Sequence, residues 1–253
     1  MQISFQLYSA RNAGTQPDVF QMLARLGFQN VEAYSAGFSD IDALEGDLGK
    51  AGLQLPSAHV GLEQLEADTA GWIGVAKRLG IQTVYIPYLA EEQRPATTDG
   101  YHALAERVAK LLPAFQAAGL GLGWHNHDFE LRPLSDGSIP LSVLLDAVPD
   151  LQWEADLAWV VRADAAPADW VQRYAPRISA VHVKDIAPDG QNAEEDGWAD
   201  LGDGVIEWQA LLQLIKDEAP DALLILEHDN PSDAARFASR SLAKLNSLLE
   251  GLA

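Results

Sequence analysis

The chain has 253 residues, with 17 Lys and Arg against 37 Asp and Glu, and a formal net charge of -20 at neutral pH. This field repels phosphate backbones and anionic lipid, and no local basic patch offsets it, so nucleic acid and membrane surfaces are not expected as partners. The absence of cysteine excludes disulfides and thiolate metal sites, and no stretch resembles a signal peptide or a transmembrane helix. We therefore expect a cytoplasmic protein that attracts cations.

One unit recurs along the chain: a short apolar run, a polar turn, and a longer segment with helical spacing. In order, strands are expected over residues 2–8, 29–34, 53–60, 82–87, 151–157, 177–184 and 222–227. A further strand, the fifth in chain order, is expected to begin at residue 119 and to run into the segment 123–130. Helices are expected from Pro17 to Gly27, over 40–51, through Ala76 and Leu79, and over 98–118, 139–147, 168–174, 207–218 and 233–249. Residues 185–205 form the longest irregular loop, which is a candidate lid.

Eight strand-then-helix units of this length predict a single (β/α)8 TIM barrel over residues 1–253. No Pro/Gly/Ser-rich linker or charge block divides the chain. The alternative is an open doubly wound sheet. Against it, the turn at residues 8–14 lacks the G-x-G-x-x-G spacing of a dinucleotide-binding loop.

The motif Gly123-Trp-His-Asn-His-Asp-Phe-Glu130 ends the fifth predicted strand. Alternation along a strand places His125 and His127 on one face, and Glu130 follows where the chain turns. Two imidazoles and a carboxylate in this arrangement suit a metal ion or a proton-transfer site. The alternative is a pair of hydrogen-bonded core histidines beside an exposed Glu130.

Nearly every predicted strand ends in a polar or ring-bearing residue, where a barrel carries its active site. These residues are Gln6, Tyr8, Glu32, Tyr34, His59, Pro87, His127, Asp156, His182, Lys184 and Glu227, with Glu130 just beyond the fifth strand. Converging carboxylates in a barrel mouth repel each other unless a cation joins them. Carboxylates and a histidine from separate strands form an oxygen and nitrogen site for Mn²⁺, Mg²⁺, Co²⁺ or Zn²⁺.

Each residue also has a purely structural interpretation. Asp156 could cap the turn that follows it, His182 could be a hydrogen-bonded core histidine, and Glu227 could cap the last helix. Glu154 lies on the same face as Asp156 and should pair with a base such as Lys184, unless the register is displaced by one residue. Together in one layer of one fold, these residues favour a metal site.

The chain resembles the xylose isomerase-like TIM-barrel superfamily over essentially its whole length. Within it, the chain is similar to the sugar phosphate isomerases/epimerases, whose relatives include inosose dehydratases and lyases of 3-keto-glycosides. The resemblance is carried by Gln6-Leu-Tyr-Ser9, His125-Asn-His-Asp-Phe-Glu130, Asp156 followed by Trp159, His182-Val-Lys-Asp185, Gly202-Asp-Gly204 followed by Trp208, and Leu226-Glu-His228.

The resemblance implies one divalent metal ion, Mn²⁺ foremost, held by Glu130, Asp156, His182 and Glu227. It implies that His127 acts as an acid or base, and that the substrate contacts are Gln6, His59, Trp159 and Lys184. Many ketose epimerases of the superfamily carry a metal-binding glutamate at the end of the fifth strand, where this chain has His125-Asn-His127. Glu130 is therefore the expected first ligand, with His125 as the alternative. A homodimer is expected from the resemblance alone.

A metal that chelates a carbonyl oxygen and a neighbouring hydroxyl acidifies the C–H between them by stabilising an enediolate. Return of the proton gives an isomerase or epimerase acting on a ketose or keto-sugar, whereas departure of a β-substituent gives a lyase or dehydratase. His127, Glu130 and Glu227 are the expected catalytic residues, with His127 and Glu227 moving protons. Tyr8 and Trp159 would form flat walls for the sugar, or would simply pack at the rim.

Other functions remain to be weighed against this one. A nuclease like endonuclease IV needs more histidines than the 6 present and a basic surface. A non-catalytic sugar-binding barrel that uses Trp72, Trp170, Trp198 and Trp208 is a further alternative. Gly202-Asp-Gly204 is interpreted as a tight turn rather than a phosphate cradle, and without a basic cluster a phosphorylated substrate is not expected.

Overall fold

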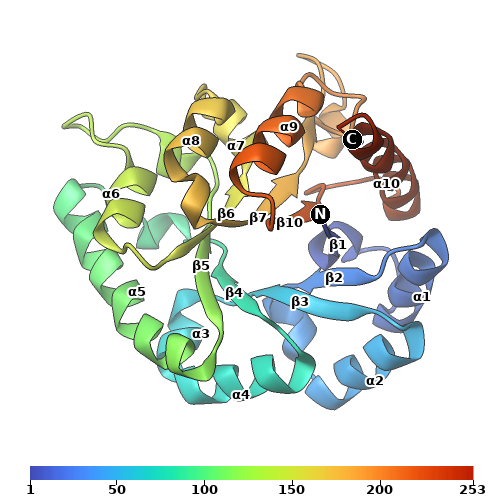
Figure 1. Ribbon diagram of the computed structural model, residues 1–253, viewed down its shortest axis with the longest axis horizontal. Helices are drawn as coiled ribbons and strands as arrows, with labels where there is room; N and C mark the ends of the chain where they lie inside the picture. The colour runs from blue at the N-terminus through green and yellow to red at the C-terminus, as the bar shows by residue number, and fades with distance from the viewer. Residues whose placement is uncertain (253) are drawn as a thin grey trace.

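Parallel strands pair side by side until the sheet closes on itself in the computed structural model, which describes residues 1–252 (Figure 1). The order round the barrel is β1-β10-β7-β6-β5-β4-β3-β2, so β1 pairs with both β2 and β10. The strands are β1 (Ile3–Gln6), β2 (Asn30–Ala33), β3 (Gln54–His59), β4 (Thr83–Ile86), β5 (Gly121–His125), β6 (Gln152–Asp156), β7 (Ile178–Val183) and β10 (Leu223–Leu226). The predicted (β/α)8 barrel is confirmed, and the open sheet is excluded because an open sheet has two unpaired edge strands.

Helices surround the barrel as a ring (Figure 1). They are α1 (Gln16–Leu26), α2 (Ile41–Ala51), α3 (Leu62–Ala67), α4 (Thr69–Leu79), α5 (Thr98–Ala118), α6 (Pro140–Ala147), α7 (Leu157–Arg162), α8 (Pro167–Tyr174), α9 (Trp208–Glu218) and α10 (Ala234–Glu250). Their ends follow local rules, as in α1, where Thr15 accepts a hydrogen bond from the Asp18 amide and Gly27 adopts the left-handed conformation, with φ 101°.

Three details differ from the predicted elements. The third helical segment is two helices, because the Asp68 side chain accepts a hydrogen bond from the Gly71 amide and starts α4 directly after α3. The short helix α7 follows β6 without a loop. The predicted irregular loop over 185–205 contains a small antiparallel pair, β8 (Asp185–Ile186) and β9 (Trp198–Ala199).

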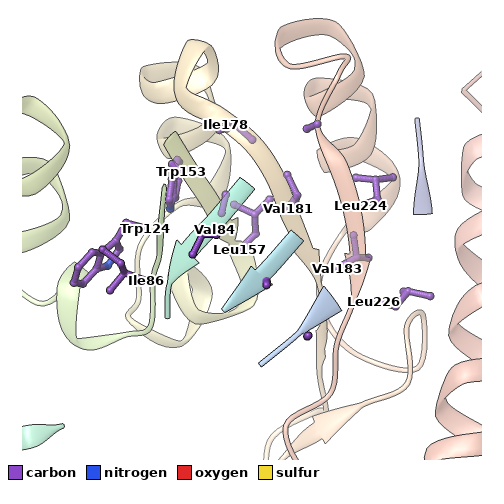
Figure 2. Packing of buried hydrophobic residues seen from close by; sticks show 14 of the residues in the cluster. Val84, Ile86, Trp124, Trp153, Leu157, Ile178, Val181, Val183, Leu224 and Leu226 are labelled. Atoms are coloured by element: carbon purple, nitrogen blue, oxygen red, sulfur yellow. The ribbon is translucent and has the colours of Figure 1, made fainter. Parts of the chain in front are cut away.

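The main hydrophobic core lies between the barrel and the helices. Alternate residues of each strand point outward into it, as Val84 and Ile86 do on β4 and Trp124 does on β5 (Figure 2). Tyr85, between Val84 and Ile86 in the sequence, belongs instead to a small separate cluster with Ala180 and Ile225. The apolar part of the barrel interior is therefore thin, and polar side chains fill the rest.

The part of the chain that the structure describes contains no helix long and apolar enough to cross a membrane. The prediction of one domain over 1–253 remains a prediction, and its last residue, Ala253, lies outside the described residues.

The close approach of β4 and β5 predicts a strong effect of one added methyl group. A Cβ at Gly123 would lie 2.4 Å from the Tyr85 ring and 3.0 Å from the Gln152 carbonyl oxygen. Gly123→Ala should therefore lower the free energy of unfolding by about 1–3 kcal/mol, measured by chemical denaturation. Gly46→Ala in α2 is the control, since nothing lies within 4 Å of its Cβ position, and it should be neutral or stabilising. Equal stability of the two variants would contradict this packing.

Candidate metal and substrate site

Four buried side chains from neighbouring strands converge at the mouth of the barrel. His125 and Asp156 end β5 and β6, His182 lies on β7, and Glu227 follows β10. Asp156 pairs in register with His182, and His182 with Ile225, which brings these strand ends to one level. One ligand atom from each of the four lies within 4.8 Å of the others, so this group, which we call the mouth group, could hold a metal ion.

A second group lies beside the first and shares two of its histidines. His59, His125, Glu154 and His182 also place one ligand atom each within 4.8 Å of the others. His59 Nε2 is 2.5 Å from Glu154 Oε2, and His125 Nδ1 is 3.0 Å from the same oxygen. Glu32 joins this inner group, because its Oε1 is 3.2 Å from His59 Nε2.

His182 stands between the two groups with a carboxylate at each ring nitrogen. Its Nδ1 is 2.9 Å from Glu227 Oε2, and its Nε2 is 3.0 Å from Glu32 Oε1. A histidine that binds a metal through one ring nitrogen commonly donates its other N–H to a carboxylate. Glu32 is placed to hold His182 in that way, with Nδ1 facing the mouth group.

Lys184 supplies the positive charge at the mouth. Its ammonium lies 2.9 Å from Glu227, 3.1 Å from Asp156 and 2.8 Å from Asp229. Glu154 pairs with basic side chains as expected, but these are three histidines and not Lys184. Glu154 lies on the predicted face, so the alternation expected along β6 holds, although the pairing of β6 with β7 shifts register between Trp153 and Glu154.

The charged groups inside the barrel strongly shift one another's pKa values. Burial alone would raise the pKa of Glu32, but the charge of His59 and the hydrogen bond with His182 outweigh it and lower that pKa. Burial would lower the pKa of His59, yet Glu32 and Glu154 raise it to about 10. For Glu154, burial and the charge of Glu32 raise the pKa. Protons on His59 and His182, whose pKa values are both raised, thus offset part of the carboxylate charge, whereas burial and the charge of His182 lower the pKa of His125.

Several buried atoms in both groups lack a hydrogen-bond partner among the described residues. They are His125 Nδ1, Asp156 Oδ2, Glu154 Oε1 and Glu32 Oε2. Buried polar atoms are nearly always satisfied, and an exception calls for an explanation such as an ion. Asp156 Oδ2 lies 3.1 Å from the Lys184 ammonium and His125 Nδ1 lies 3.0 Å from Glu154, and both side chains could also bind a divalent cation in the mouth group.

Asp156 serves two purposes at once. Its Oδ1 accepts a hydrogen bond from the Trp159 amide at 2.9 Å and so caps α7, as the structural interpretation predicted. Asn126 fixes the backbone of Asp156 from both sides, accepting from its N–H at 3.0 Å and donating to its carbonyl at 3.1 Å. The remaining carboxylate oxygen, Oδ2, is held beside Lys184.

Glu130 does not lie with the mouth group. Its two oxygens accept hydrogen bonds from the Trp124 indole at 3.1 Å and from the His127 amide at 2.8 Å. The chain turns after His127 into a short 3-10 helix (Phe129–Leu131), which directs Glu130 to the outer face of β5 where Trp124 needs an acceptor. Burial raises the pKa of Glu130 to about 8. Of the two candidates for the first ligand, the structure brings only His125 to the others.

A cavity of about 640 Å³ opens above the mouth group. Six of the residues named above as candidate ligands, catalytic groups or substrate contacts line it: Tyr8, His59, His125, His127, Trp159 and Glu227. Gln6 and Lys184 do not line it, because both are buried behind its wall, where Gln6 donates to Glu32 at 2.7 Å. Its other lining residues include Tyr34, Tyr88, Asp128, Asp229 and Arg94.

Arg94 was not identified from the sequence. It follows the 3-10 turn Glu91–Gln93 in the long connection between β4 and α5, and nothing in that segment except its position after a strand end indicates a site.

His127 lines this cavity among aromatic side chains. Its ring lies 5.4 Å from that of Trp159 and 5.0 Å from that of Tyr88, between centroids, and its Nδ1 has no hydrogen-bond partner within residues 1–252. Burial and the nearby charge of Lys184 lower the pKa of His127 to about 3, which leaves the imidazole neutral at pH 7.

The connection over 185–205 is held together by its first residue. Asp185 accepts hydrogen bonds from the amides of Ile186, Gly202 and Ile206. The amide of Gly202 is thereby used within the protein, which supports a tight turn at Gly202-Asp-Gly204 rather than a phosphate cradle.

Three comparisons place this architecture among known proteins. A family described as "Xylose isomerase-like TIM barrel" matches residues 20–247. A sugar phosphate isomerase/epimerase from Parabacteroides distasonis is similar with a TM-score of 0.81 and 16% identity, covering 97% of this chain and 96% of its own. No curated protein sequence matches significantly.

Two further solved structures show the same fold at low identity. The probable 3-DHS dehydratase AsbF from Bacillus anthracis has a TM-score of 0.78 and 16% identity, covering 97% of this chain and 99% of its own. The IolI protein with a bound zinc atom has a TM-score of 0.80 and 12% identity, covering 100% of this chain and 99% of its own.

The three carboxylates around Lys184 predict that its removal is costly. Lys184→Met should destabilise the protein by about 3–5 kcal/mol, because it leaves buried charges without a partner. Chemical denaturation measures this loss, and added Mn²⁺ should restore part of it by replacing the missing charge. Lys50→Met, which breaks an exposed pair with Asp47, is the control and should change stability by about 1 kcal/mol or less. A similar small loss for both variants would contradict the assigned role of Lys184.

Proposed function

The chain belongs to the xylose isomerase-like TIM barrel family, and from this we propose that it is a metal-dependent sugar isomerase or epimerase that removes a proton beside a substrate carbonyl. The observation that carries the proposal is the buried mouth group of His125, Asp156, His182 and Glu227 directly beneath a cavity of about 640 Å³. This volume lies within the range of roughly 300–1,000 Å³ that small-molecule sites occupy.

The mouth group is the proposed ligand set for one divalent ion. Two carboxylates and two imidazoles suit Mn²⁺, Co²⁺ and Zn²⁺, with Mn²⁺ as our first choice and Mg²⁺ less suited because it prefers oxygen ligands. We propose His125, and not Glu130, as the first ligand, since both Glu130 oxygens already accept hydrogen bonds. When bound, the ion would polarise a substrate carbonyl and so acidify the neighbouring C–H.

His127 and Glu227 are the proposed proton-handling residues. His127 presents a buried ring nitrogen without a partner at the cavity wall, where a substrate proton could be accepted. Burial alone would raise the pKa of Glu227, but Lys184 and His182 outweigh it and lower that pKa, so Glu227 is an anion. Glu130 acts indirectly, because its hydrogen bond to the His127 amide fixes the start of the turn that carries His127.

The cavity walls suit a sugar. Tyr8 and Trp159 line it with flat apolar faces that can cover the C–H side of a pyranose or an open-chain ketose. Gln6 and His59 position Glu32 beneath it. The substrate class is therefore a ketose or keto-sugar, in a cytoplasmic protein that we expect to form a homodimer.

Elimination is the second candidate reaction. It shares the first step of proton removal, and the chain is similar in fold to a probable 3-DHS dehydratase. The outcome depends on whether a β-substituent leaves before the proton returns. The same residues would serve as acid and base, so the product distinguishes the two reactions.

The ligand assignment predicts a specific pattern of metal loss. Protein purified without chelator should contain about one divalent ion per chain, and Asp156→Asn and Glu227→Gln should each lower its affinity by roughly 10-fold or more. Glu130→Gln should keep the ion. Mass spectrometry of metal content with equilibrium dialysis measures all four proteins. Retention of metal in Asp156→Asn together with its loss in Glu130→Gln would reverse the assignment.

The proton-transfer role predicts exchange with solvent. In D₂O, the protein should introduce deuterium beside the carbonyl of a ketose or 3-keto-sugar, detected by NMR. His127→Asn should slow this exchange by roughly 10²–10⁴-fold while retaining metal. His102→Asn, on the outer helix α5, is the matched control and should exchange at the wild-type rate. Exchange at an unchanged rate in His127→Asn would eliminate His127 as the base, and no exchange on any substrate would favour the non-catalytic sugar-binding barrel.

A further inference from the structure

Arg94 is the only lysine or arginine among the residues that line the cavity in the described part of the chain. It belongs to a protein with a formal charge of -20, in which arginines and lysines are greatly outnumbered by carboxylates. The arginines at positions 78, 107, 132, 173, 236 and 240 each form an ion pair with Asp or Glu. Arg94 has no carboxylate oxygen within 4.0 Å over residues 1–252, and its hydrogen bonds go to neutral groups.

The guanidinium of Arg94 is held in place by neutral groups. Its Nε donates to the Leu89 carbonyl at 3.0 Å, and its Nη2 donates to the Tyr88 hydroxyl at 2.6 Å. Its Cζ lies 3.9 Å from the centroid of the Phe129 ring, over its face. These contacts fix the orientation of the planar guanidinium group and leave its Nη1 donors without a partner among the described residues.

Barrel order places Arg94 across the cavity from the acidic wall. Arg94 follows β4, whereas Glu227 and Asp229 follow β10. In the closed order, three strands separate β4 from β10 in either direction, so these two strands face each other across the barrel. Arg94 therefore lies on the side of the cavity opposite Glu227 and Asp229, whose carboxylates are already paired with Lys184.

We propose that Arg94 is a specificity-determining residue that binds an anionic group of the substrate, a carboxylate or a phosphate, in the cavity above the mouth group. A preorganised guanidinium fork binds either group through paired N–H donors. Because Arg94 lies across the barrel from Glu227, an anionic group bound to Arg94 leaves the other end of the substrate, with its carbonyl, toward the mouth group. This inference rests on the proposed function for the identity of that carbonyl end, and it revises the expectation that a phosphorylated substrate is excluded.

The experiment is titration calorimetry of the protein as purified with three probes of similar size: D-gluconate, D-glucose 6-phosphate and uncharged D-glucitol. The wild type should bind at least one of the two anions about 10-fold or more tightly than glucitol, as expected for charge-assisted hydrogen bonds. Tighter binding of gluconate or of the phosphate identifies which anion the site takes. Arg94→Met should abolish the preference, and Arg94→Lys should keep part of it.

Arg107→Met is the matched control, because it also removes one positive charge, and its partner Glu66 does not line the cavity. It should keep the preference of the wild type. Circular dichroism and thermal melting establish that each variant is folded, and Arg94→Lys provides the comparison if Arg94→Met is not. Equal binding of anions and glucitol by the wild type, or a preference that survives in Arg94→Met, would overturn the proposal.

This failure can be told apart from failure of the proposed function. Metal content and deuterium exchange with an uncharged keto-sugar do not depend on Arg94 and should be retained in Arg94→Met. If the wild type lacks metal and exchange but Arg94 still governs anion binding, the reaction is wrong and the anion subsite stands. If Arg94 only holds the Leu89 backbone in place, Arg94→Met should weaken the binding of charged and uncharged probes to the same extent.

Discussion

Burial of like charges in one small volume is the constraint on which this structure depends. The barrel interior holds the carboxylates of Glu32, Glu154, Asp156 and Glu227 with a single ammonium, that of Lys184. Isolated buried carboxylates are so costly that they must be paired, protonated or bound to a cation. His59 and His182, whose pKa values the neighbouring carboxylates raise, offset part of this cost by carrying protons, which links the stability of the barrel to the chemistry of its mouth.

The strand register brings these charged side chains together at the mouth of the barrel. Because side chains alternate along each strand, the outer positions of β4 to β7 carry apolar residues under the helices, and the inner positions bring His125, Asp156 and His182 to one level. Large apolar side chains inside the barrel are confined to the thin cluster around Tyr85. Asn126, on the outer face, fixes the backbone of Asp156, so residues that never reach the cavity set the positions of those that do.

The fold and most of the site followed from the sequence, since hydrophobic periodicity and strand alternation are local properties. Glu32, His59 and His182 came from alternation alone and lie where expected. Glu130 did not join the group because it follows the last strand residue, where a 3-10 turn and the indole of Trp124, rather than alternation, decide its direction. Lys184 and Glu154 took partners that depend on distances between strands, and Arg94 lies in a connection whose path no local pattern specifies.

The most direct test of this account is the anomalous scattering of Mn²⁺ in crystals of the protein. We predict one strong peak within roughly 2.5 Å of ligand atoms from His125, Asp156, His182 and Glu227. A peak among His59, Glu154 and Glu32 instead would move the metal to the inner group and remove it from the cavity. A crystal with no peak at either place would contradict the central claim that the mouth of the barrel is a metal centre.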